Sequence, residues 1–324
     1  MNFCTHFDSN YLPHALSLLD SLNCNLERFN LFMMCMDDEC FKYLESNPKK
    51  NVVPIHYNKM EKYFPELLIA KKNRNRIEYF FTCSPAVCNY VIQSFSSIES
   101  ITYLDADLYF FSSPKVIFDE IKNKSIAIIE HKFNWITKRQ IKYGKFNVGW
   151  ITFKNDNEGL KCINQWMKDC IDWCYQKVEK NRFGDQKYLE KWPSQYKNLH
   201  IINNKGANVA IWNIGKYNLS KKGDQIYINE EKLVFYHFAN LNQISSSCFR
   251  TNLSRVLVRL KGILENDIYR PYGKKLLSNN IFNKIIQTKK ENQIKSLSYN
   301  RVIIFSRNLR RVFFKDEFCI NDLD

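Results

Sequence analysis

Apolar residues near the start of the chain alternate between short continuous runs and helix-like spacing. The pattern predicts strands over residues 2–7, 29–36 and 52–56, with helices over 12–22 and 39–45. This β-α-β-α-β order is typical of a largely parallel sheet with helices on its faces. We therefore expect an α/β, Rossmann-like fold in which a ligand binds beyond the carboxyl ends of the strands.

A second group of elements follows the basic stretch Lys71–Arg76, which is either a solvated face or a contact for phosphates. Pro85 begins a predicted helix that runs to Ser94, with Ser84 as its cap. The later pattern predicts strands over 100–104, 125–130, 146–153, 199–203, 225–228 and 233–238, a helix over 157–179, and a helical turn after Gln186.

The composition of the chain changes near Ser245, where basic residues begin to mix with apolar ones at roughly helical spacing. Of the formal charge of +15, an excess of nine falls in residues 246–324, which hold 16 Lys and Arg against 7 Asp and Glu. We predict an α/β domain over 1–245 and a basic, mainly helical region over 246–324. That region would pack on the domain or lie on an anionic membrane surface.

The 11 cysteines show no C-x-x-C pair and no histidines at zinc-finger spacing. Because many lie in apolar runs, we expect buried, reduced thiols rather than disulfides or a metal framework. The start of the chain does not look like a signal peptide, and no run is long enough to span a membrane. These features favour a cytoplasmic protein, with peripheral attachment to the inner face of the membrane as the alternative.

Asp105-Ala106-Asp107 is the strongest chemical signal, because two carboxylates directly follow an apolar strand. Side chains two residues apart at a strand end can face one divalent cation, and hard oxygen ligands suit Mg²⁺ or Mn²⁺. Such an ion would bridge the diphosphate of a nucleotide-sugar. The alternative is a solvated acidic turn, since an isolated D-x-D occurs by chance in many chains.

Three other positions carry weaker signals. Asp8 ends the first strand, so the segment 5–11 is a natural nucleotide contact. His237 lies in an apolar strand and is either a hydrogen-bonded core residue or a third metal ligand. Asp185 and Gln186 precede a helical stretch, where they would hold sugar hydroxyls, cap the helix, or do both.

Taken together, these stretches resemble the retaining GT-A glycosyltransferases of the glycogenin and lipopolysaccharide-galactosyltransferase group. The similarity extends to bacterial nucleotide-diphospho-sugar transferases of surface-polysaccharide loci and covers about residues 1–245. The matching segments are CTHFDSNYLPHALSLLDSL (4–22), EYFFTCSP (78–85), ITYLDADLYFF (101–111), IIEHKF (128–133), YGKFNVGWITFKND (143–156), WCYQKVEKNRFGDQKYLEKWP (173–193), GANVAIWNI (206–214) and FYHF (235–238).

The resemblance implies a role for each matching residue. Asp105, Asp107 and His237 would bind Mn²⁺ (or Mg²⁺), and Ala106 lies between the two carboxylates in the donor-binding segment. The remaining implied contacts are Thr5, Phe7, Asp8 and Tyr11 for uridine, Arg76 for the donor, Asn147 for the donor sugar, Asp185 and Gln186 for the reacting sugar, and Asn208 and Trp212 for the acceptor. The family's Gly- and Lys-containing loop over the diphosphate is missing, because residues 238–242 read FANLN.

The resemblance thus implies a metal-dependent hexosyltransferase that acts from a UDP-sugar on a glycan or glycolipid hydroxyl and retains the anomeric configuration. Retention would use either a covalent intermediate on Asp185 or attack on the same face as the leaving phosphate. A sugar nucleotidyltransferase is the nearest rival, but residues 1–22 contain no glycine for a phosphate-binding loop. The non-enzymatic rival is a protein that binds anionic surfaces or nucleic acid through its basic tail, and of these nucleic acid is the less expected partner.

Overall fold

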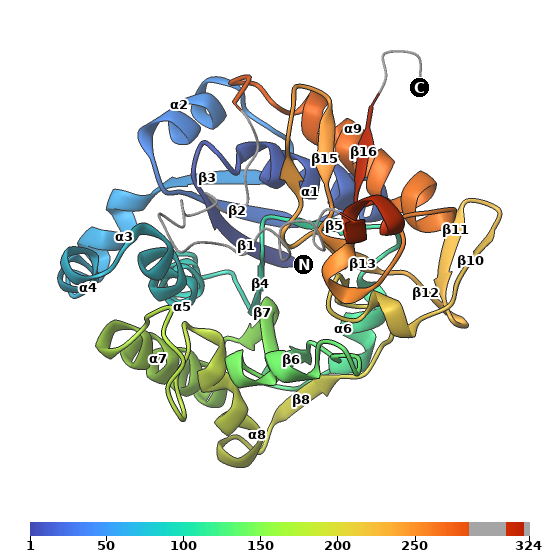
Figure 1. Ribbon diagram of the computed structural model, residues 1–324. Coiled ribbons are helices and arrows are strands. Elements are labelled where there is room, and N and C mark those ends of the chain that lie inside the picture. The colour runs from blue at the N-terminus through green and yellow to red at the C-terminus, as the bar shows by residue number, and fades with distance from the viewer. Residues whose placement is uncertain (285–308, 321–324) are drawn as a thin grey trace, which may run out of the picture.

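A seven-stranded sheet forms the centre of the computed structural model, which describes residues 1–284 and 309–320 (Figure 1). The strand order is β3-β2-β1-β4-β7-β6-β8. All neighbouring pairs are parallel except those of β7, which runs antiparallel to β4 and β6. The strands are β1 (Asn2–Phe7), β2 (Asn30–Cys35), β3 (Val52–His56), β4 (Ser100–Leu104), β6 (Ile126–Glu130), β7 (Phe146–Lys154) and β8 (Leu199–Ile202). The predicted α/β class with a mostly parallel sheet is therefore confirmed.

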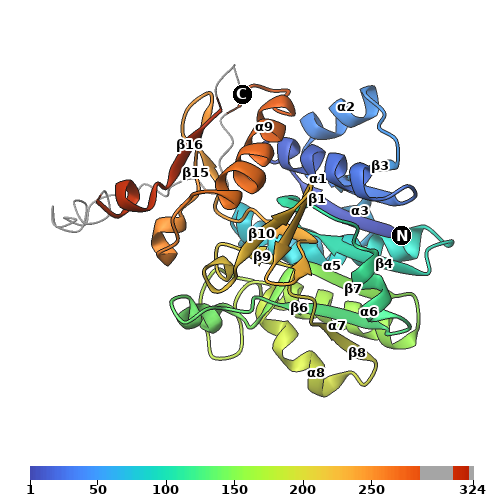
Figure 2. The ribbon, with the colours of Figure 1, turned by 90° about the vertical axis from the view of Figure 1, so that its right-hand side faces the viewer.

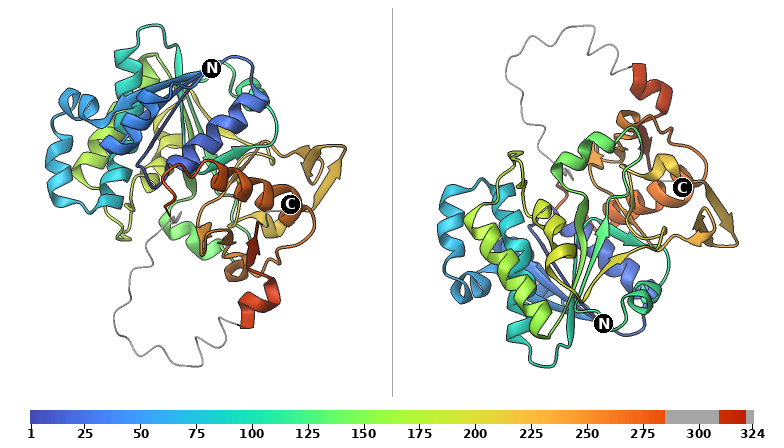
Figure 3. Two further views of the ribbon diagram at one scale, coloured as in Figure 1. Left: turned by 90° about the horizontal axis from the view of Figure 1, so that it is seen from above. Right: turned by 90° about the horizontal axis from the view of Figure 1, so that it is seen from below.

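Helices cover both faces of this sheet (Figures 1 and 3). Alternate residues of β1 point to opposite faces, so Phe3 and Phe7 join one apolar core and Cys4 joins the other. The first core lies under α1 (Leu12–Asn25), α2 (Asp38–Ser46) and α6 (Lys115–Ile121). The second lies under α3 (Tyr57–Tyr63), α5 (Arg76–Ser94), α7 (Asn157–Asp172) and α8 (Trp192–Gln195), with α4 (Leu67–Asn73) packed against α5.

Three smaller sheets flank the central one. The first joins β5 (Leu108–Phe110), β13 (Phe235–His237) and β9 (Val209–Ala210), and it connects the chain after β4 with a segment far along the sequence. The other two are β10 (Leu219–Lys222), β11 (Gln225–Ile228) and β12 (Glu231–Lys232), and then β14 (Asn242–Gln243), β15 (Cys248–Arg250) and β16 (Glu317–Cys319). Short 3-10 or π segments are η1 (Lys138–Tyr143), η2 (Gln186–Lys191), η3 (Ile214–Lys216), η4 (Leu253–Val256) and η5 (Leu264–Tyr269).

The region after residue 245 contains strands as well as the expected helices. Its helix α9 (Arg270–Ser278) packs on α1, where Tyr272 and the His14 imidazole Nδ1 form a 2.7 Å hydrogen bond. A third apolar core runs from Val209 to Phe318 and so includes residues on both sides of position 245. The predicted segments within 285–308 lie outside the described residues.

The cysteine prediction was wrong at one pair. Cys248 and Cys319 lie opposite each other on β15 and β16 and form a disulfide. They are 71 residues apart in the sequence, so no short cysteine motif predicts the pairing. The other nine cysteines are free, and all of them except Cys24 are buried, as expected for reduced core thiols.

The helix predicted from Pro85 was also wrong at its start, because α5 begins at Arg76 and carries Pro85 in its interior. Asn75 is the true cap: its side chain accepts from the backbone N–H of Glu78, and the Glu78 carboxylate accepts from the backbone N–H of Asn75. This reciprocal capping box outweighs the helix-start preference of proline. The helix predicted to reach residue 179 ends earlier, at Asp172.

We predict that Asn75→Ala lowers the free energy of unfolding by about 1 kcal/mol, because a helix donor loses its partner. Urea unfolding followed by circular dichroism measures the change. Asn75→Ser is the matched control, since a serine hydroxyl still accepts from the Glu78 N–H. Equal stability of Asn75→Ala and the wild type would contradict the capping assignment.

Candidate functional site

A cleft of about 400 Å³ lies beyond the carboxyl ends of β1 and β4. Twelve of the predicted site residues line it: Phe7, Asp8, Tyr11, Arg76, Asp105, Ala106, Asp107, Asn147, Asp185, Gln186, Trp212 and His237. Thr5 and Asn208 are buried but do not line the cleft. The fold therefore gathers in one place residues that are spread over more than two hundred positions of the chain.

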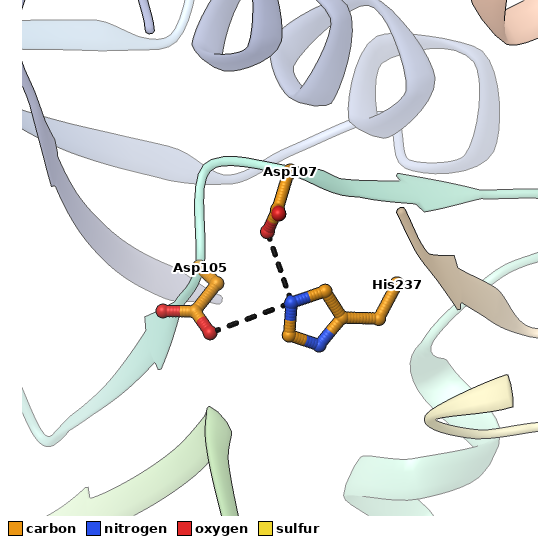
Figure 4. Close-up of side chains that lie close together, drawn as sticks. All are labelled: Asp105, Asp107 and His237. Carbon is orange, nitrogen blue, oxygen red and sulfur yellow. Dashed lines mark ion pairs between the residues drawn. The ribbon is translucent and has the colours of Figure 1, made fainter. Parts of the chain in front are cut away.

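Asp105, Asp107 and His237 point toward one another on the floor of the cleft (Figure 4). The His237 Nε2 atom lies 3.0 Å from the Asp107 carboxylate and 3.6 Å from that of Asp105. Pairing between β13 and β5 sets this geometry, because His237 is opposite Leu108 and the Phe238 N–H donates to the Asp107 carbonyl at 3.0 Å. One ligand atom from each residue lies within 4.8 Å of the others, so the three could hold a metal ion.

Burial and the short distances between these three side chains shift their pKa values. Burial raises the pKa of Asp105 to about 6, and the neighbouring Asp107 carboxylate adds to this while His237 opposes it. For Asp107, burial is outweighed by His237, which holds the pKa of that carboxyl below its ordinary value. The pKa of His237 is raised, because the two carboxylates outweigh the effect of burial. A positive charge at this point is thus stabilising, and a divalent cation would supply one.

A chain of hydrogen bonds behind His237 orients its ring. Burial lowers the pKa of His131 to about 3, so this imidazole is neutral, and its Nδ1–H donates to the Lys145 carbonyl at 3.2 Å. Its Nε2 then accepts from the Asn147 amide nitrogen at 3.3 Å. The Asn147 carbonyl oxygen accepts from His237 Nδ1–H at 3.3 Å and from the Gly149 N–H at 3.2 Å. The partner of each ring nitrogen determines whether that nitrogen carries a proton. This series of hydrogen bonds leaves His237 Nε2 facing the carboxylates.

His131 was not singled out by the sequence interpretation, although it lies in the matching segment 128–133. Its neighbours identify it: the ring stacks on Phe133 with centroids 4.7 Å apart and meets the edge of Trp212 at 5.0 Å. His6, from the predicted nucleotide-contact segment 5–11, and Tyr103, directly before the acidic turn, also line the cleft, and the residues that were not predicted there are Ile77, Phe80, Phe81, Ser84, Val148, Ala239 and Asn240.

The other end of the cleft begins at the turn between β1 and α1. The Asp8 carboxylate accepts the backbone N–H groups of Asn10 at 2.9 Å and Tyr11 at 3.1 Å, which fixes the turn. Its second oxygen forms an ion pair with Arg76, the first residue of α5. Within the part of the chain that the structure describes, Arg76 is the only Lys or Arg that lines the cleft, and its side chain is 60% exposed.

Asp185 and Gln186, which the resemblance assigns to the reacting sugar, both line the cleft. The Ser84 hydroxyl donates to the buried Asp185 carboxylate at 2.8 Å, and burial raises the pKa of Asp185 to about 7. Gln186 donates from its amide to the Tyr143 carbonyl at 2.9 Å. The Asp185 side chain forms no capping hydrogen bond to η2, so the capping alternative is not supported.

Of the two residues assigned to the acceptor, only Trp212 reaches the cleft. Its ring meets the His237 ring edge-on at 5.0 Å, and its buried Nε1–H has no acceptor among the described residues. Asn208 instead adopts a positive φ of 59° and donates from its amide to the Glu130 carbonyl at 3.0 Å. That position suits a structural turn, because asparagine tolerates this backbone region.

Fold and site together define an α/β protein with a candidate divalent-metal centre at the carboxyl edge of its sheet. The chain belongs to the same family as two Bacillus subtilis (strain 168) proteins. The uncharacterized protein YfnD is 33% identical over 254 residues, which cover 76% of this chain and 80% of YfnD. The uncharacterized protein YfnF is 30% identical over 253 residues, which cover 75% of this chain and 82% of YfnF. No family model matches the sequence.

Among solved structures, the galactosyltransferase LgtC in complex with donor and acceptor sugar analogues is similar to this chain. The match covers 73% of this chain and 86% of the LgtC chain, at 14% identity and a TM-score of 0.48. A likeness of this size carries no argument about activity, so the activity has to follow from the site residues themselves.

We predict that Asp185→Asn stabilises the protein above about pH 7. A carboxyl whose pKa is raised from 3.8 to about 7 by folding makes the native state most stable below pH 3.8, and this contribution is lost as the pH rises through 7. An asparagine is neutral at every pH and can still accept from Ser84. The advantage of the variant should grow between about pH 4 and pH 7 to the order of a few kcal/mol.

Urea unfolding at several pH values measures this difference. Asp172→Asn, at an exposed position on the last turn of α7, is the control and should change little. A stability difference between Asp185→Asn and the wild type that does not vary with pH would show that burial does not raise the pKa of the Asp185 carboxyl.

Proposed function

We propose that this chain is a metal-dependent glycosyltransferase of the GT-A type that transfers a hexose from a UDP-sugar to a hydroxyl group. The observation that carries the proposal is the convergence of Asp105, Asp107 and His237 within 4.8 Å on the floor of the cleft. Two carboxylates and an imidazole suit Mn²⁺, and Mg²⁺ is the alternative. The bound ion would neutralise the diphosphate of the donor as it leaves the sugar.

The remaining cleft residues fit the other parts of a nucleotide-sugar. Asp8 and Tyr11, at the end of β1, would contact the nucleoside, with Phe7 beside them and Thr5 contributing through the backbone. Arg76 would release Asp8 and turn to the diphosphate, because no other Lys or Arg lines the cleft within residues 1–284 and 309–320. Asn147 would use its second amide hydrogen for the donor sugar, and Asp185 and Gln186 would face the reacting carbon. Trp212 and Asn208 would shape the acceptor side of the cleft, Trp212 as a lining residue and Asn208 as a buried residue behind the lining.

Retention of the anomeric configuration has two routes in such a cleft. Asp185 would be the nucleophile of a covalent intermediate, since the Asp8 carboxylate accepts from the backbone N–H groups of its own turn and the other two lining carboxylates belong to the metal centre. Same-face attack would instead use the departing phosphate as the base and leave Asp185 to orient the sugar. Both routes place Asp185 next to the reacting sugar.

A surface glycan or glycolipid of the lipopolysaccharide or capsule type is the acceptor that we propose, and a cytoplasmic site of synthesis belongs to the same proposal. Contact of residues 246–324 with an anionic membrane is a further part of it. No helix within the described part of the chain is long and apolar enough to cross a bilayer. The nucleotidyltransferase alternative is not favoured, because Arg76 is the one Lys or Arg that a triphosphate would meet among the described residues of the cleft.

Hydrolysis of a panel of UDP-sugars, with Mn²⁺, with Mg²⁺ and with a chelator, tests donor and metal together. We predict metal-dependent release of UDP from at least one UDP-hexose. Asp105→Asn and Asp107→Asn should each lower this rate by at least about a hundredfold, because a neutral amide is a weaker ligand than a carboxylate. Far-ultraviolet circular dichroism should show both variants folded. Full activity in both would refute the metal assignment.

We also predict that Asn147→Leu weakens Mn²⁺ binding by about 10–100-fold, because His237 loses the acceptor that fixes its ring. Electron paramagnetic resonance of free Mn²⁺ measures the affinity without any turnover. Asn147→Asp is the matched control, since its carboxylate still accepts from His237 Nδ1–H, and it should keep the affinity. Equal Mn²⁺ affinity for Asn147→Leu and the wild type would remove the orienting role of Asn147.

A further inference from the structure

The loop that borders the cleft carries an unusual set of exposed residues. Residues 131–145 include Trp135, which is 82% exposed, and Ile141, which is 46% exposed. Lys138, Arg139 and Lys142 are exposed beside them. The chain from residue 131 to residue 155 contains no Asp or Glu. The loop therefore presents an indole, an aliphatic side chain and several cations to the solvent, with no acidic side chain of its own to pair with them.

This loop is fixed to the cleft at both ends. His131 lines the cleft, and the Thr137 hydroxyl donates to the Trp212 carbonyl at 2.6 Å. At the other end, the Tyr143 carbonyl accepts from the Gln186 amide at 2.9 Å. Because Trp212 and Gln186 both line the cleft, whatever contacts this loop is held at the mouth of the candidate site.

Two other segments with the same character lie on this side of the molecule. The short helix 309–314 exposes Val312 to 81% and Phe313 to 68%, with Arg310 exposed beside them. Residues 253–262 expose Leu257 to 46%, together with Arg259 and Lys261. The chain from 232 to 264 contains no Asp or Glu.

Packing contacts connect the three segments. Gly215 lies between Asn134 and Val258 with no room for a side chain, which joins the loop to residues 253–262. The Leu260 N–H donates to the Phe314 carbonyl at 3.0 Å, which joins residues 253–262 to the helix 309–314. In Figure 2 the green loop and the red helix project to the same side, and in both views of Figure 3 they lie at the same end. We name residues 131–145, 253–262 and 309–314 the rim surface.

We infer that the rim surface docks on an anionic lipid bilayer, so that the cleft opens onto the headgroup layer. Indole and aliphatic side chains gain by entering the boundary between headgroups and acyl chains, and the cations gain from the anionic headgroups. Exposed Val312 and Leu257 decide the class of partner, because nucleic acid and glycans offer cations a partner but offer aliphatic side chains none. The inference deepens the proposed transferase, since it places the acceptor hydroxyl on a lipid-linked molecule.

Co-sedimentation of the full chain with vesicles tests the docking. We expect binding to phosphatidylcholine vesicles that contain phosphatidylglycerol, weakening as salt is added, and little binding to phosphatidylcholine alone. The triple variant Trp135→Gln, Val312→Gln, Phe313→Gln should lower the partition coefficient by on the order of tenfold or more. Its matched control is Leu68→Gln, Ile69→Gln on α4, which is not part of the rim surface and where these side chains are 43% and 66% exposed.

A second variant separates charge from apolar contact. Lys138→Gln, Arg139→Gln, Lys142→Gln should lower binding to the anionic vesicles at least about tenfold, while Lys49→Gln, Lys50→Gln, also at exposed positions, should lower it little. No binding by the wild type, equal binding to neutral vesicles, or equal loss in the rim and control variants would each overturn the docking. Tighter binding to single-stranded RNA than to the vesicles would overturn the choice of partner. Donor hydrolysis without vesicles tests the transferase separately, so the two proposals can fail independently.

Discussion

The structure depends most on the attraction between the buried Asp107 carboxylate, the partly exposed Asp105 carboxylate and the buried His237 imidazole. Asp105 and Asp107 would repel each other in a site removed from water, and His237 is the group that offsets this repulsion. The course of the main chain brings these three side chains together. β4 ends directly before Asp105, the chain turns through Ala106, and the pairing of β13 with β5 places His237 beside the two aspartates. Replacing a proton on His237 by a divalent ion would raise the net charge of the three side chains and the bound cation from −1 to 0, which favours an anionic ligand.

Hydrogen bonds between neutral groups, rather than further charged side chains, hold the His237 ring in place. The chain from the Lys145 carbonyl through His131 and Asn147 to His237 has one direction only, because a carbonyl can accept but never donate. Burial helps here as well, since a neutral His131 can accept from Asn147 while a charged one cannot. A carbonyl in the loop after η1 thus determines which nitrogen of a distant histidine faces the carboxylates.

Local patterns were enough to predict most of the strands, including β1 and β3 to the residue, because their apolar runs are bounded by polar turns. The same approach failed where the deciding contact was reciprocal or distant. The capping box of Asn75 and Glu78 was present in the sequence but Pro85 was preferred, and the Cys248–Cys319 disulfide requires strands that only the fold places side by side. The floor of the site was predictable because D-x-D follows a strand. His131 was not, since its role depends on three partners that the sequence leaves apart.

The distribution of charge over the molecule follows from these constraints. Among the described residues, four carboxylates and the Arg76 guanidinium line the cleft, although the whole chain carries a formal charge of +15. Under the proposed function, a basic cleft would bind a diphosphate without a metal and would also hold the released nucleotide, whereas a cleft rich in carboxylates would bind it only through the ion. Most of the excess positive charge therefore lies outside the lining of the cleft, and part of it lies on the rim surface around the same cleft. An α/β sheet binds its ligands at the carboxyl edge of its strands, so a surface at that edge brings any partner within reach of the reacting atoms.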